Sequence, residues 1–141
     1  MASLSVSIHV PADAVHVRAA RKSVESLLCD HGFAVDRIAS FALALSEALF
    51  NALDHGGAEN GIDLEVNLLA DRAEAAVDNA SLDAEAPVDD LADLLAEAGV
   101  EVPDANVERG RGLHLMATRA DEVRCESLAD GRTRIVLVLK R

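Results

Sequence analysis

Apolar residues recur along the chain at two spacings, about two and about 3.6 residues, which are the periods of strands and helices. Apolar and polar residues alternate over residues 4–10, and this predicts a half-buried strand that a proline ends. Helical spacing over residues 15–28 predicts a first helix, stopped by a His-Gly pair. A second and more apolar helix is expected over residues 35–55, where two following glycines close it.

The second half of the chain alternates again at four places, which pair naturally as two hairpins. Residues 62–68 and 73–79 are predicted to form the first hairpin, and residues 122–127 and 133–140 the second, with Asp130-Gly131 as a strong turn signal between them. The elements expected between the hairpins are a loop over residues 80–87, a short acidic helix over 89–99, a second loop to residue 112, and a helix over 113–120.

This order of elements favours one fold class. Helices and strands are segregated along the chain rather than strictly alternating, which argues against a doubly wound parallel sheet. We therefore expect an α+β domain built as a two-layer sandwich, in which a mixed, mostly antiparallel sheet carries helices on one face. The 141 residues suffice for one such domain, 1–141, and not for two.

Composition excludes several functions. The formal net charge is −12, so direct nucleic-acid binding is not expected, and with three Phe and no Trp or Tyr a stacking platform for bases is not expected either. No apolar run approaches the roughly 20 residues of a membrane span, and no signal peptide is recognised at the start. Cys29 and Cys125 lack metal-ligand spacing, which suits a cytoplasmic protein with ordinary thiols.

The apolar second helix carries an unusual polar stripe. Glu47, Asn51 and His55 are four residues apart and so share one side of the helix. A solvated helix face would explain them, but such a face normally carries both signs of charge, and this one has no Lys or Arg. An acid beside an amide suits a hard metal ion that prefers oxygen ligands. The zinc-protease, Walker-loop and nucleophile-elbow motifs are all absent.

A second signal is the stretch "ERGRGLHLM", which precedes the last predicted helix. Gly110 and Gly112 bracket Arg111 and would let the backbone approach a phosphate, which the N–H groups of the following helix would then meet. Arg109 adds positive charge in an otherwise acidic chain. A flexible loop leading into a helix is the alternative explanation. An acidic chain can still bind ATP, because a magnesium ion and backbone N–H groups handle the phosphates.

Together, "ALSEALFNALDHG" and "GRGLHLM" resemble the N box and G2 box of the GHKL superfamily, the histidine-kinase-like ATPases. Within it, this short chain is similar to the anti-sigma-factor serine/threonine kinases of bacterial partner switching. The resemblance extends from the opening strand to the closing hairpin. It implies Mg-ATP as cofactor, a sigma factor as partner, an anti-anti-sigma antagonist protein as phosphorylation substrate, and a homodimer.

The resemblance also implies roles for individual residues. Asn51 would hold the magnesium ion, and Glu47 would be the general base that takes the proton of a Ser or Thr hydroxyl. Asp78 would read the adenine amino group. The remaining nucleotide-binding positions implied by the family are His55, Arg109, Gly110, Arg111, Gly112, Leu113 and Thr133.

One segment departs from the family pattern. The Asp-x-Gly of the G1 box is represented by Asp78 and Ala80, so the glycine is missing, and the segment is one residue short. Alanine tolerates a positive φ poorly, so this loop must follow another path or bear strain. This departure keeps a second hypothesis open, a catalytically weak or inactive anti-sigma binding module of the same fold. The ATP-binding domain of a two-component histidine kinase is a further alternative, disfavoured because no phospho-acceptor helix is present.

Overall fold

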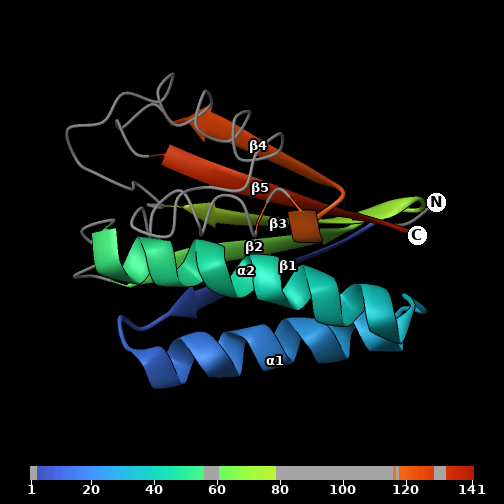
Figure 1. Ribbon diagram of the computed structural model, residues 1–141, viewed down its shortest axis with the longest axis horizontal. Coiled ribbons are helices and arrows are strands. Elements are labelled where there is room, and N and C mark those ends of the chain that lie inside the picture. Colours follow the sequence, from blue (N-terminus) through green and yellow to red (C-terminus); the bar gives the residue numbers. More distant parts are fainter. Residues whose placement is uncertain (1–2, 56–60, 79–115, 117, 129–132) are drawn as a thin grey trace.

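The computed structural model describes residues 3–55, 61–78, 116, 118–128 and 133–141 (Figure 1). Two helices and five strands lie within these ranges. They are β1 (Leu4–Val10), α1 (Ala14–Asp30), α2 (Val35–His55), β2 (Ile62–Leu68), β3 (Arg72–Asp78), β4 (Glu122–Ser127) and β5 (Thr133–Lys140).

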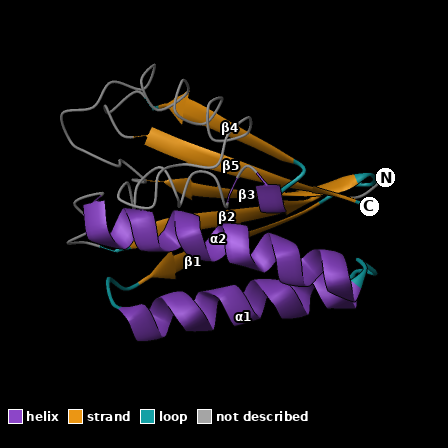
Figure 2. Cartoon of the chain, in the orientation of Figure 1, coloured by secondary structure: helices purple, strands orange, loops and turns teal. Residues whose placement is uncertain are grey.

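The five strands form one sheet with the order β1-β2-β3-β5-β4. Every pairing between these strands is antiparallel, and both helices pack on the same face of the sheet (Figure 2). The predicted α+β two-layer class is therefore confirmed, with a sheet that is wholly antiparallel in its described strands. β5 lies between β3 and β4, so the last strand of the chain is an inner strand.

The helix ends follow from local chemistry. The side chain of Asp13 caps α1 by accepting a hydrogen bond from the backbone N–H of His16 at 2.8 Å. Gly32 follows the end of α1 with φ +85°, a conformation that a residue with a Cβ rarely adopts. These signals mark the two ends of α1, which extends one and two residues beyond the predicted 15–28, whereas α2 has the predicted bounds.

The core lies between the helices and one face of the sheet. It joins Val24 and Leu28 of α1 to Leu45 and Leu49 of α2, and to alternate strand residues such as Leu64. Because side chains alternate along a strand, the intervening residues face the other way. α1 and α2 do not cover that second face, on which a separate small cluster of Ala76, Val136 and Val138 is buried.

Several predictions concern residues that the structure does not describe. The loop over 80–87, the acidic helix over 89–99, the loop to residue 112 and the turn at Asp130-Gly131 all lie outside the described residues. Of the helix predicted over 113–120, Met116, Thr118 and Arg119 are described and helical. β4 and β5 pair antiparallel from Ser127 and Thr133 onward, as two strands of a hairpin do.

Candidate functional site

Asn51 is the one buried polar residue among those described, with 9% of its surface exposed. It lies in the last quarter of α2, between core residues Leu49 and Ala52, which are fully buried. Its Nδ2 atom is enclosed and has no hydrogen-bond partner. Burying an amide without a partner costs free energy, so an Asn at this position needs an explanation other than packing.

Glu47 precedes Asn51 by one turn of α2, so the two side chains share a side of the helix. It is partly buried, and this desolvation raises the pKa of its carboxyl above the ordinary value. A raised pKa makes a carboxylate a better proton acceptor near neutral pH. The acid–amide pair predicted from the sequence is therefore present on one side of α2, with Asn51 buried and Glu47 partly exposed.

These residues fit a magnesium–nucleotide complex rather than a metal cage built by protein alone. Among the described residues no group of three or more His, Cys, Asp or Glu side chains is placed to hold a metal. Magnesium in nucleotide sites typically keeps waters and phosphate oxygens as ligands and takes only one or two from protein. The unpaired end of Asn51 is its amide nitrogen, which does not bind a cation. The O and N positions of an amide are assigned from their partners, and with the two exchanged the Asn51 oxygen would supply such a ligand.

The other predicted positions are only partly described. His55 is the last residue of α2, and its side chain lies outside the described set, as do Arg109, Gly110, Arg111, Gly112 and Leu113. Thr133 is the first residue of β5, and its backbone pairs with Ser127. The end of α2, the end of β3 and the start of β5 lie at the same end of the molecule (Figure 1).

Asp78 is not brought together with Glu47 and Asn51. It is the last residue of β3 and stands opposite Arg134 of β5, whose guanidinium binds both of its carboxylate oxygens. Its neighbours on the same face are Ala76 and Val136, which belong to the cluster away from the helices. The structure thus places this carboxylate on the other face of the sheet from α2.

Sequence reasoning missed two polar arrangements. Arg134 was not singled out, although it is the partner of Asp78. Arg37 at the start of α2 binds the Asp121 carboxylate ahead of β4 and so ties α2 to the segment that follows Met116. Neither pair has a local sequence signal, because each joins residues more than fifty positions apart.

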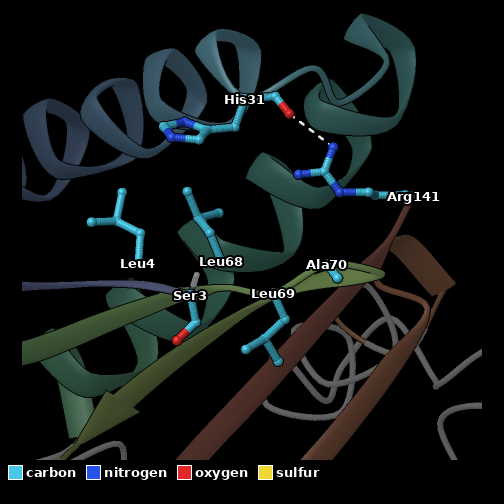
Figure 3. Close-up of a pocket in the computed structure, with 7 residues that line it drawn as sticks. All are labelled: Ser3, Leu4, His31, Leu68, Leu69, Ala70 and Arg141. Carbon is cyan, nitrogen blue, oxygen red and sulfur yellow. Dashed lines mark hydrogen bonds between the residues drawn. The ribbon is translucent and has the colours of Figure 1, made fainter. Parts of the chain in front are cut away.

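A pocket of about 540 Å³ lies at the other end of the sheet, near the end of α1 (Figure 3). Its walls are mostly apolar, from Leu4, Leu68 and Leu69, and Arg141 crosses its rim to donate a hydrogen bond to the carbonyl oxygen of His31 at 2.8 Å. The Arg141 guanidinium also lies 4.3 Å from the ring centre of Phe33. Of the predicted site residues whose side chains the structure describes, none lines this pocket.

An antiparallel sheet with two helices on one face, and an acid–amide pair on the second helix, agree with the histidine-kinase-like ATPase fold expected from the motifs. The family model of the histidine kinase-like ATPase domain matches residues 10–139, and the chain belongs to this family. The resemblance stated from the sequence motifs is thereby confirmed.

Two known proteins are similar to this chain. It is 31% identical over 127 residues to the serine-protein kinase RsbW of Bacillus subtilis strain 168, covering 86% of this chain and 78% of RsbW. It also shares the fold of a chain in the crystal structure of the SiaB–SiaC complex from Pseudomonas aeruginosa, with a TM-score of 0.63 and 10% identity over 95% of this chain and 88% of that one. No helix among the described residues is long and apolar enough to cross a membrane.

Proposed function

We propose that this protein is an ATP-dependent serine/threonine kinase of a partner-switching system. It binds Mg-ATP, holds a sigma factor inactive, and phosphorylates an anti-anti-sigma antagonist on Ser or Thr. The observation that carries the proposal is the buried Asn51 amide with an unpaired end, one turn after a Glu47 carboxyl of raised pKa. The similarity to a serine-protein kinase supports the choice of reaction.

Asn51 and Glu47 of α2 have different roles in this proposal. Asn51 would hold the magnesium ion, which when bound neutralises charge on the phosphates. Glu47 would accept the hydroxyl proton of the protein substrate, and partial burial keeps its carboxylate poorly solvated for that task. By the family pattern, the nucleotide would contact His55, the stretch from Arg109 to Leu113, and Thr133. Asp78 is left out of this assignment because Arg134 holds it on the other face.

A binding module without phosphotransfer is the second candidate. Ala80 favours it, because the sequence lacks the glycine that the family uses in the loop after Asp78. Both candidates sequester the same partner, so they differ in chemistry alone. We further propose that the protein acts as a homodimer in the cytoplasm.

Thermal unfolding with ATP, with and without magnesium, tests nucleotide binding. Binding to the native state raises the melting temperature, by an amount that grows with ligand concentration over Kd. Asn51→Ala should remove the magnesium-dependent part of this shift. Asn67→Ala serves as the matched control, since Asn67 lies on β2 and bonds to Glu65 on the face without helices. An unchanged shift in Asn51→Ala would show that Asn51 is not the ligand.

Phosphotransfer to a candidate antagonist tests the chemistry. Loss of a general base typically costs about 10²–10⁴-fold in rate, so Glu47→Gln should lower transfer by at least the smaller factor while ATP binding persists. If the wild-type protein binds ATP but transfers no phosphate, and Glu47→Gln binds its partner normally, the binding module is the correct function.

A further inference from the structure

The Asp78 carboxylate forms a bidentate ion pair with the Arg134 guanidinium. Arg134 Nε donates to Oδ1 at 2.5 Å and Arg134 Nη2 donates to Oδ2 at 3.0 Å. The Asp78 side chain is 14% exposed and the Arg134 side chain 30% exposed, so water competes little for either. Bidentate guanidinium–carboxylate pairs are stronger and more directional than single contacts, and this one joins two neighbouring strands directly across the ladder.

The direction of Asp78 follows from the pleat of β3. Ala73, Ala75 and Val77 belong to the main core beneath the helices. Ala76 belongs to the cluster on the other face, and Asp78, two residues further, shares its side of the strand. In register with β5, Val77 stands opposite core residue Ile135, which confirms the assignment of faces.

The charges around the pair explain why the carboxylate turns toward Arg134. Asp63 of β2 stands opposite Asp78 in the sheet, and like charges in that relation repel. Asp63 is paired with His9 of β1 at 3.0 Å, on the side away from Asp78. On the far side of Arg134, Glu126 of β4 stands in register with it. One row of ionisable side chains thus crosses all five strands, with the Asp78–Arg134 pair near its middle.

Reading an adenine amino group would demand a different geometry. Glu47 and Asn51 belong to α2, which packs on one face of the sheet. Under the proposed function the nucleotide binds on that side, so a carboxylate that accepts from its base would have to point there. The Asp78 oxygens can accept further hydrogen bonds, but with Arg134 they lie on the face of the sheet away from α2.

We infer that Asp78 is a strand-pairing residue that fixes β5 against β3, and that base recognition does not depend on its carboxylate. The inference about the base rests on the proposed function, because it presumes a nucleotide at the edge of α2. The inference about strand pairing stands on the ion pair and the register alone.

A double-mutant cycle tests strand pairing without nucleotide. Asp78→Asn and Arg134→Gln should each lower the melting temperature, by about 3–6 °C for a domain of this size, and the double variant should lose clearly less than the sum. Asp78→Glu, which keeps the carboxylate, should recover part of the loss. Additive losses, or an unchanged melting temperature in Asp78→Asn, would overturn the pairing role.

Dissociation constants for ATP and GTP, measured with magnesium by titration calorimetry, test the base. Asp78→Asn should leave the ratio of the two constants within about twofold of wild type. A selective loss of ATP affinity of about 10²-fold or more, with GTP unaffected, would overturn the inference. If the wild-type protein binds neither nucleotide, the proposed function and the statement about the base fail together, whereas the melting cycle still decides the role in strand pairing.

Discussion

Partial burial of Glu47 raises the pKa of its carboxyl, and this has a consequence for stability. A carboxyl with a raised folded pKa binds protons more readily when folded, so stability falls as pH rises above the ordinary pKa. Glu47→Gln should therefore raise the melting temperature at pH 7, by roughly 1–2 °C. The gain should shrink as pH falls toward the ordinary glutamate value of 4.5. Far-UV circular dichroism melts at several pH values measure it, and a gain independent of pH would contradict this account.

The two cysteines should react very differently. Cys29 is exposed on α1, whereas desolvation raises the pKa of Cys125 on β4 to about 11. Because the thiolate is the reactive form, alkylation of Cys125 at pH 8 should be slower than that of an ordinary thiol by about two orders of magnitude. Mass spectrometry after timed iodoacetamide treatment resolves the two sites, and Cys29→Ser isolates the slow one. Equal rates in the folded protein would show that Cys125 is not shielded.

Individual site residues were predictable to different degrees. The pairing of Glu47 with Asn51 follows from spacing on one helix, so the sequence alone predicts it. The direction of Asp78 does not, because Ala75, Ala76 and Val77 are consecutive apolar residues and allow either phase of alternation. A shift of one residue turns every side chain of a strand to the other face. Only the pairing with β2 and β5 fixes the phase that points Asp78 toward Arg134.

At the scale of elements, boundaries were predictable and neighbours were not. Alternation, helical spacing and the His-Gly stop near position 32 are local signals, and they place both helices and all five strands to within two residues. The position of β5 between β3 and β4 depends on contacts between distant segments. Such contacts leave no periodic pattern in the sequence, so the order of the strands in the sheet could not be predicted from it.

Asp121 joins three of these elements through one side chain. Its Oδ2 accepts hydrogen bonds from Arg37 of α2 and from the backbone N–H of Lys140 in β5, the latter at 2.6 Å. Its own N–H donates to the carbonyl of Val138 at 2.8 Å. This residue therefore fixes the segment that enters β4 against both layers of the fold.

Substitutions can separate the two roles of the Asp121 carboxylate. Arg37→Ala removes a partly exposed ion pair and should cost about 0–1 kcal/mol. Asp121→Ala also leaves the Lys140 N–H without its acceptor and should cost about 1–3 kcal/mol, with Asp121→Asn between the two. Urea unfolding followed by far-UV circular dichroism provides the measurement. Equal costs for Arg37→Ala and Asp121→Ala would mean that the bond to β5 contributes nothing.

Considered whole, the described part of the molecule has one main core to which both layers contribute. α2 is central to it, because its buried residues contact α1 on one side and the sheet on the other. The proposed functional pair Glu47–Asn51 sits on the same helix, so the residues proposed to bind ligand lie among residues that hold the fold. A core shared in this way predicts that the helices and the sheet unfold together.

Two leucines of α2 test this prediction as a matched pair. Leu45 is fully buried and Leu43, two residues earlier, is 48% exposed. Leu45→Ala should lower the free energy of unfolding by about 2–5 kcal/mol, since it removes packed atoms and leaves a cavity. Leu43→Ala removes the same atoms from a solvated position and should change it by no more than about 0.5 kcal/mol.

Urea unfolding by far-UV circular dichroism suits the measurement, because the chain has no Trp or Tyr to serve as a fluorescent probe. Both variants should unfold in a single transition with the m-value of the wild-type protein. A second transition in Leu45→Ala would show that the helical layer and the sheet separate, and would contradict a shared core. A large loss in Leu43→Ala would instead mean that its side of α2 is covered in solution, as it would be in a complex with another chain.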